Sequence, residues 1–118
     1  MTQLTDAFQP VCQDAQVKLK GVLRGLFGGM VKGYLPQKWI FRTESEAVTF
    51  SVAKAGTASV EAGEGSPPDV IITIDHDYLL EALRTRKRPE VEPRNLDVEF
   101  RTEKGRTAFN YIRKEIGV

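Results

Sequence analysis

The sequence predicts a single α+β domain with one mostly antiparallel five-stranded sheet and helices packed on one face. Apolar residues recur every three or four positions in residues 4–30 and every second position in residues 38–62, which is typical of a helix followed by strands. Short turns join the expected strands and favour antiparallel pairing. The 118 residues suffice for one core. We therefore expect one domain over 1–118, with a helical region at 1–34 and the sheet and other helices at 37–118.

The first region is predicted to form one long or broken amphipathic helix from about Asp6 to Lys32. Its apolar face carries Leu4, Phe8, Val11, Cys12, Ala15, Leu19, Val22, Leu23, Leu26, Phe27 and Met30. Thr5 or Asp6 is the expected cap, and Pro10 either lies in the first turns or marks a kink. Gly33 then ends the helix, because glycine tolerates a left-handed exit.

Three strands should follow as an antiparallel meander, since short polar turns separate them. Their alternating apolar residues are Trp39 and Phe41, then Val48, Phe50 and Val52, then Ala58, Val60 and Ala62. The glycines and prolines of residues 63–68 forbid continued pairing. This loop is the segment that we expect to be most mobile.

The rest of the chain is predicted to alternate strand and helix. Residues 70–74 form a continuous apolar and β-branched run, which indicates a strand buried on both faces at the sheet centre. Asp75 and Thr102 are placed to cap the two helices that follow. The expected core positions are Tyr78, Leu79, Ala82 and Leu83, then Leu96, Val98 and Phe100, then Ala108, Phe109, Ile112 and Ile116.

Composition excludes several classes of protein. Seventeen basic residues nearly cancel sixteen acidic ones, so no global field attracts nucleic acid, and we expect no nucleic-acid partner. Charged residues interrupt every apolar run before it reaches the length of a membrane span. A lone cysteine and the lack of a signal-peptide pattern favour a reducing cytoplasm.

The residues that could carry chemistry are isolated from one another. His76 lies between two aspartates at a helix start, where capping and compensation of the helix dipole explain the triplet better than a metal site or a general base does. Cys12 lies on the apolar stripe, as a buried small hydrophobe would. No serine has a nucleophile-elbow motif around it. We expect no catalytic residue, no metal and no cofactor, and hence no enzyme.

Two basic segments leave alternatives open. Lys104, Gly105 and Arg106 at the start of the last helix either bind an anion or are solvated first-turn residues. The basic run Arg84–Arg88 either contacts an anionic partner or is a solvated helix end.

Glycines recur every fourth residue at positions 21, 25, 29 and 33. Each interior glycine weakens a helix by about 1 kcal/mol relative to alanine. The glycines therefore serve the close approach of another backbone, or make this segment a mobile lid over an apolar cavity. Its lysines and arginine beside an apolar face also fit transient contact with a membrane surface.

Residues 68–75, Pro-Asp-Val-Ile-Ile-Thr-Ile-Asp, precede a helix that carries Tyr78, Leu79, Leu80 and Leu83. This pattern, with the hairpin that opens near Lys38 and ends near Gly56, resembles the sterol carrier protein type two family from about Gln37 to the C-terminus. The resemblance implies a non-enzymatic fold in which sheet and helices enclose a tunnel for fatty acyl chains, sterols or related lipids.

The leading hypothesis is therefore a binding module that holds a lipid or other long apolar molecule between its sheet and its helices. Large aromatic residues and methionine make adaptable apolar walls. The expected lining residues are Leu23, Leu26, Phe27, Met30, Phe41, Phe50, Phe100, Phe109 and Ile112. The alternative is an interaction module with a filled core, whose glycine-spaced helix packs into a homodimer or against a partner.

Overall fold

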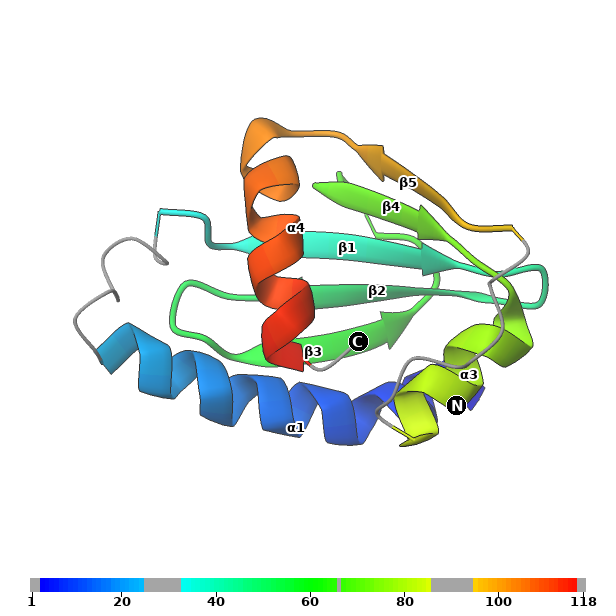
Figure 1. Cartoon of the computed structure of the whole chain (residues 1–118), viewed down its shortest axis with the longest axis horizontal. Helices are drawn as coiled ribbons and strands as arrows, with labels where there is room; N and C mark the ends of the chain where they lie inside the picture. The colour runs from blue at the N-terminus through cyan, green and yellow to red at the C-terminus, as the bar shows by residue number, and fades with distance from the viewer. Residues whose placement is uncertain (1–2, 25–32, 66, 86–94, 117–118) are drawn as a thin grey trace.

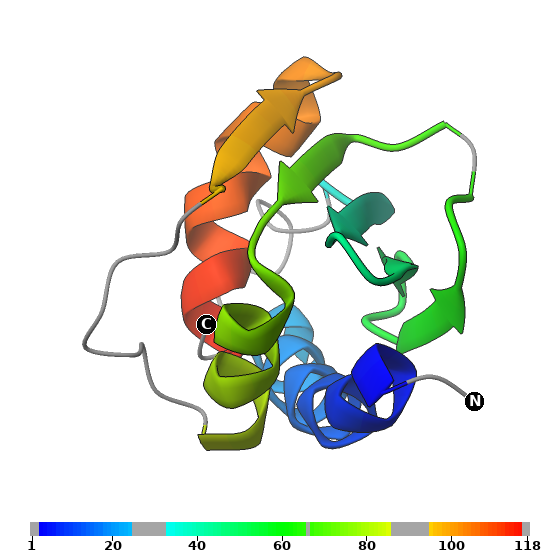
Figure 2. The ribbon, with the colours of Figure 1, turned by 90° about the vertical axis from the view of Figure 1, so that its right-hand side faces the viewer.

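The computed structural model describes residues 3–24, 33–65, 67–85 and 95–116. In chain order the elements are α1 (Gln3–Arg24), β1 (Gln37–Arg42), β2 (Ala47–Val52), β3 (Ala58–Ala62), β4 (Val70–Thr73), α3 (His76–Thr85), β5 (Asp97–Phe100) and α4 (Glu103–Ile116). The described helices lie on one face of a five-stranded sheet (Figures 1 and 2). The α+β class is confirmed. None of these helices has both the length and the apolar character that a membrane crossing requires.

The strand order is β3-β2-β1-β4-β5. The meander of β1, β2 and β3 is antiparallel as expected, and β5 is antiparallel to β4. However, β4 pairs with β1 in parallel, so the sheet is mixed and the expectation of a mostly antiparallel sheet is wrong. The prediction failed because a short connection without a helix seemed to exclude a parallel pairing.

The connection between β3 and β4, described at residues 63–65 and 67–69, lies over the face of the sheet that points away from the helices (Figure 2). It passes three strand spacings of about 4.8 Å each and also returns along the strands, because β3 and β4 both run parallel to β1. At up to about 3.3 Å per residue, an extended chain of this length can make that crossing. We call residues 63–69 the strap, and the face that it crosses the outer face.

Side chains of β1 and β2 fasten the described residues of the strap. The Thr49 hydroxyl donates to the Gly63 carbonyl oxygen at 2.8 Å and accepts from the Gly65 N–H at 2.7 Å. Arg42 and Glu64 form an ion pair at 2.7 Å. Ile40, an outer-face residue by strand alternation, is only 2% exposed. The segment expected to be most mobile is thus tied down at several points.

Helix α1 supplies the largest cover of the opposite, inner face. It begins at Gln3, earlier than predicted, because Leu4 is fully buried and draws the first turn onto the core. Pro10 consequently lies inside the helix. Its side chain is exposed, so water can satisfy the backbone carbonyl that loses its partner there. Residues 25–32, the end of the predicted helix, lie outside the described residues.

Strand β4 alternates between buried Val70 and Ile72 and half-buried Ile71 and Thr73. The expectation of burial on both faces is therefore not met. The β-branched run gave no sign that β4 lies next to the short edge strand β5, where the outer face has less cover.

Both later helices are capped at their N-termini. The Gly105 N–H donates to the Thr102 hydroxyl at 3.0 Å, which confirms the cap predicted for α4. At α3, the His76 N–H donates to the Glu44 carboxylate at 3.1 and 3.2 Å. The Glu44 carboxylate comes from the turn between β1 and β2 and joins that turn to α3. The sequence around Asp75, which was the predicted cap, does not reveal this contact.

Gly105 and Gly21 make a matched pair for testing how closely α4 approaches the strap. A Cβ on Gly105 would lie 2.6 Å from the Asp69 carbonyl oxygen, whereas a Cβ on Gly21 would meet nothing within 4 Å. We expect Gly105→Ala to cost about 2 kcal/mol of unfolding free energy, because backbone must shift. Gly21→Ala should instead stabilise the protein by up to about 1 kcal/mol. Urea denaturation measures both, and equal stability of the two variants would contradict the close approach.

Candidate functional site

The space between the sheet and the helices is an aromatic layer, which we define as Phe8, Trp39, Phe41, Phe50, Phe100 and Phe109. The Phe8 ring lies 4.9 Å from the Phe41 ring and 5.8 Å from the Phe50 ring, measured between centroids. Trp39 connects this group to the other end of the layer, at 6.4 Å from Phe41 and 5.4 Å from Phe109. Phe109 meets Phe100 edge to face at 5.5 Å. One chain of ring contacts thus spans the layer from α1 to β5.

Four of the nine predicted lining residues belong to this layer: Phe41, Phe50, Phe100 and Phe109. Leu23 in α1 and Ile112 in α4 have described backbones, but their side chains lie outside the description. Leu26, Phe27 and Met30 lie outside the described residues altogether. Phe8 and Trp39 were missing from the predicted lining, although both lie on the apolar positions of their elements and could have been included on that signal.

The two ends of the aromatic layer differ in burial. Phe8, Trp39, Phe41 and Phe50 are buried, and their contacts leave this end filled by side chains. Phe100 and Phe109 are only half-buried and pack against the core from its edge. The rings of the layer are therefore fully buried under α1 and partly exposed where β5 meets α4, and we call this exposed end the mouth.

Gln37 is a buried polar residue beside the aromatic layer, and sequence reasoning missed it. Its amide nitrogen donates to the carbonyl oxygens of Tyr34 and Lys104, the latter at 3.1 Å. Its amide oxygen accepts from the Trp39 indole N–H at 3.0 Å. A buried amide with all these partners holds the indole in one orientation and joins β1 to α4.

A guanidinium lies at the mouth. The Arg106 guanidinium carbon is 4.9 Å above the centroid of the Phe100 ring, a cation–π geometry. The side chain is otherwise exposed. A positive charge therefore lies beside the half-buried rings.

His76 joins three segments of the chain. One ring nitrogen, Nδ1, lies 3.0 Å from the Thr43 hydroxyl, and the other, Nε2, lies 3.1 Å from the Gln3 amide oxygen and 3.9 Å from Glu46. The ring is buried and ties α1 to the β1–β2 turn, a tertiary contact that the predicted capping and dipole compensation did not include. Within the described residues, no group of three His, Cys, Asp or Glu side chains has a metal-binding arrangement.

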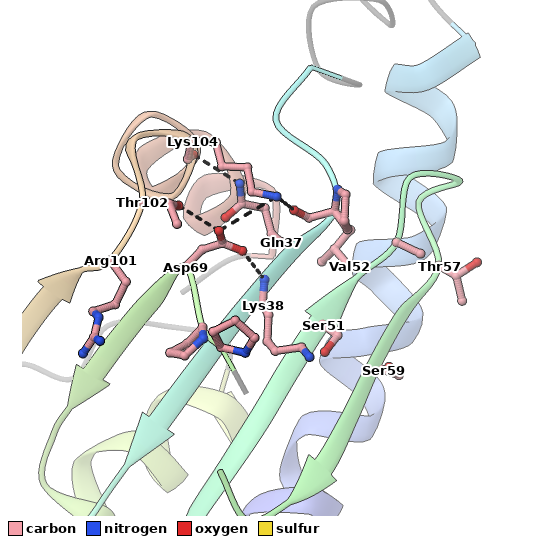
Figure 3. A pocket seen from close by; sticks show the side chains of 14 residues that line it. Gln37, Lys38, Ser51, Val52, Thr57, Ser59, Asp69, Arg101, Thr102 and Lys104 are labelled. Atoms are coloured by element: carbon pink, nitrogen blue, oxygen red, sulfur yellow. Dashed lines mark hydrogen bonds and ion pairs between the residues drawn. The ribbon is translucent and has the colours of Figure 1, made fainter. Parts of the chain in front are cut away.

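A groove of about 810 Å³ opens on the outer face, near the end of the strap (Figure 3). Lys38, Arg101 and Lys104 bring positive charge to it, and none of the nine predicted lining residues takes part. These cations already have partners inside the protein. Lys104 Nζ donates to the Pro36 carbonyl oxygen at 2.8 Å, and Arg101 pairs with Glu99 at 2.8 Å. The positive charges of Lys104 and Arg101 at the groove are thus compensated by acceptors within the protein.

The Asp69 carboxylate lies at the centre of this groove and is buried (Figure 3). One oxygen accepts from the Lys38 backbone N–H at 2.9 Å, and the other accepts from the Thr102 hydroxyl at 2.7 Å. Lys104 Nζ is 3.9 Å from it. Asp69 therefore places a negative charge at the N-terminus of α4. The external anion considered for Lys104, Gly105 and Arg106 would compete with a carboxylate that the chain supplies itself.

The remaining basic candidate is the run from Arg84 to Arg88. Arg84 is exposed near the end of α3, as a solvated helix end would be. The other basic residues of the run lie outside the described residues.

No protein-family model matches this sequence, and no curated protein matches it significantly. The resemblance to the sterol carrier proteins therefore depends on the quoted sequence pattern alone.

Removing the Asp69 carboxylate should weaken the whole junction at the groove. Asp69→Ala leaves the Lys38 N–H and the Thr102 hydroxyl without their acceptor, and we expect a loss of about 3 kcal/mol of unfolding free energy. The matched control is Glu64→Ala, which removes a carboxylate from an exposed ion pair and should cost less than about 1 kcal/mol. Urea denaturation followed by Trp39 fluorescence compares them. Equal losses would contradict the role assigned to Asp69.

The Cys12 thiol should resist modification in the folded protein. Its side chain is 3% exposed, which confirms the buried position predicted for it, and burial raises its pKa to about 11. At pH 8 the thiolate is therefore scarce as well as inaccessible. A colorimetric disulfide reagent should react slowly with native protein and rapidly in denaturant. Fast reaction of the native protein, at a rate independent of its stability, would contradict this burial.

Proposed function

We propose that this protein is a non-enzymatic module that binds a long apolar molecule, such as a fatty acyl chain or a sterol, between its sheet and its helices. The observation that carries the proposal is the burial gradient of the aromatic layer, whose rings are fully buried under α1 and half-buried at Phe100 and Phe109. An apolar layer that ends at the surface in aromatic rings offers a ligand both a route of entry and a wall to contact.

Ligand entry needs space that the described side chains occupy in part. Phe109 is the natural gate, because it is half-buried, packs on Trp39 and belongs to α4. Displacing this ring would let an apolar chain take over its contacts with Trp39 and Phe100. Each buried methylene of the ligand contributes about 0.8 kcal/mol, so a long chain can offset the cost of moving one ring.

The chemistry at the mouth favours an amphiphile with a negative head. Arg106 can keep its contact with Phe100 and still pair with a carboxylate, because a guanidinium presents five donors in one plane. A fatty acid anion matches both features, with its tail against the rings and its carboxylate at Arg106. The proposal therefore predicts that a free fatty acid binds better than its methyl ester.

The resemblance to the sterol carrier proteins supports the same site. The implied tunnel lies between sheet and helices, where this chain has its aromatic layer. A single buried thiol is compatible with the cytoplasm that the sequence favours as the compartment. A loaded carrier would also need contact with a membrane surface to exchange its lipid, and the predicted apolar and basic face of the first helical region fits such contact.

The proposal is tested by ligand extraction and titration. Native mass spectrometry of freshly purified protein should show added mass that organic solvent removes, and a C16 fatty acid should raise the melting temperature. Because Trp39 is the only tryptophan and contacts Phe109, its fluorescence should report the titration. Phe109→Gln should weaken binding about tenfold by placing a polar amide at the gate.

Two controls make this result specific. Val17→Gln changes an α1 side chain that is 74% exposed and should leave affinity unchanged. Arg106→Gln should reduce the preference for the fatty acid over its methyl ester while leaving ester binding intact. Absence of bound lipid in the purified protein, together with no response of Trp39 or of the melting temperature to fatty acids, would contradict the proposal.

A further inference from the structure

Strand β5 is an open edge of the sheet with a defined hydrogen-bonding pattern. The Arg101 N–H donates to the Asp69 carbonyl oxygen at 2.8 Å, and β5 pairs with β4 in antiparallel register, with Glu99 opposite Ile71. Because hydrogen-bonding direction alternates along a strand, the backbone groups of Asp97 and Glu99 also point toward β4. Those of Val98 and Phe100 therefore point outward, and no described element pairs with them.

Helix α1 lies at the other edge of the sheet. It runs along β3 (Figure 1), and the Gln16 amide oxygen accepts from the Ala58 backbone N–H at 3.0 Å. Within the described part of the chain, α1 thus satisfies one outward N–H group of β3, whereas no strand pairs with the two outward N–H and two outward C=O groups of β5. Unpaired edges commonly recruit another strand.

A second copy of β5 complements the first in one antiparallel register. When Glu99 of each copy lies on the twofold axis, Val98 faces Phe100 of the second copy, and Asp97 faces Arg101. The outward groups of Val98 and Phe100 then form mutual hydrogen-bonded pairs, so all four groups on each edge find partners. Val98 and Phe100 are both half-buried, and on the inner face they would cover each other.

The charges on β5 match this register. Asp97 meets Arg101 of the second copy twice by symmetry. The central Glu99 residues repel each other, but each is paired with Arg101 of its own chain at 2.8 Å. Opposite charges directly across two strands stabilise the pairing by roughly 0.2–1 kcal/mol each.

The two neighbouring registers of the β5–β5 pairing are less favourable. A shift that places Val98 on the axis sets Asp97 against Glu99 of the second copy, a like-charge pair that occurs twice. A shift that places Phe100 on the axis needs the backbone of Thr102, whose carbonyl oxygen already accepts from the Arg106 N–H at 3.1 Å as α4 begins.

We propose that two copies of this chain associate through β5 into a twofold dimer whose two sheets become continuous, with Asp97 of each copy paired with Arg101 of the other. This inference does not rest on lipid binding, since it is argued from the backbone and the charges of β5, although Phe100 belongs both to this edge and to the aromatic layer. The strand has only four residues. The shared interface is therefore small, and the dimer is a weak one that dissociates on dilution.

Reciprocal charge exchange tests the register. Sedimentation equilibrium of the full chain from 10 µM to 1 mM should show reversible dimerisation. Arg101→Asp sets Asp97 against a second aspartate and should weaken the dimer about tenfold. The double variant Asp97→Arg/Arg101→Asp restores opposite charges across the axis, and should recover the wild-type dissociation constant to within about threefold. The register centred on Phe100 would not be rescued, because Glu99 would then face the new aspartate.

Proline variants give a second readout that does not depend on charge. Val98→Pro removes an outward N–H and should abolish dimerisation while leaving the monomer folded. Glu99→Pro removes an N–H that pairs with β4 and should destabilise the monomer instead. In wild-type protein, amide exchange of Val98 and Phe100 should slow as concentration rises, while Glu99 is protected at every concentration.

The results that would overturn the proposal are equally definite. A chain that stays monomeric up to 1 mM would mean that the charges of Asp97 and Glu99 only guard the edge against association. A dimer with an affinity unchanged by both Arg101→Asp and Val98→Pro would mean that another surface mediates it.

Discussion

The Asp69 carboxylate holds together three parts of the chain that are far apart in sequence. The carboxylate accepts from the Lys38 N–H in β1 and from the Thr102 hydroxyl that caps α4, and the Asp69 backbone carbonyl oxygen accepts from the Arg101 N–H just after β5. Gly105 permits this approach, because any larger residue would collide with the Asp69 backbone. The strap ends at Asp69, so this one residue determines where β4 enters the sheet and where α4 begins.

The placement of α4 determines the candidate site. A helix that starts beside Asp69 crosses the inner face with Phe109 over Trp39 and Phe100, and with Arg106 over the Phe100 ring. The buried amide of Gln37 holds α4 and Trp39 in register. The same junction extends β5 far enough for Arg101 to lie opposite Asp97 in a second copy. The mouth and the proposed dimer edge therefore both depend on this one polar contact.

Periodicity in the sequence predicted the local elements well, since burial of Leu4, Phe8, Trp39, Phe41 and Phe50 follows directly from their spacing. It did not predict the parallel pairing of β1 and β4, because that pairing depends on the path of the strap and not on the strands themselves.

The sequence also did not predict the roles of Asp69, Gln37 and Glu44. Each acts through hydrogen bonds to residues about 30 to 70 positions away, and no local pattern marks a polar residue that will be buried by tertiary structure. Four of the six residues of the aromatic layer were predicted from the sequence, but the mouth became apparent only once α4 was placed.

The central claim is that an apolar ligand enters the aromatic layer at the mouth and leaves the buried end under α1 intact. Chemical-shift mapping of ¹⁵N-labelled protein with a C16 fatty acid tests this directly. The account predicts that the largest shifts cluster at Val98, Phe100, Arg106 and Phe109 and at the Trp39 indole N–H, while Phe8 and Phe50 change little. Shifts that are absent, or that centre on the outer-face groove around Lys38 and Ser59, would contradict it.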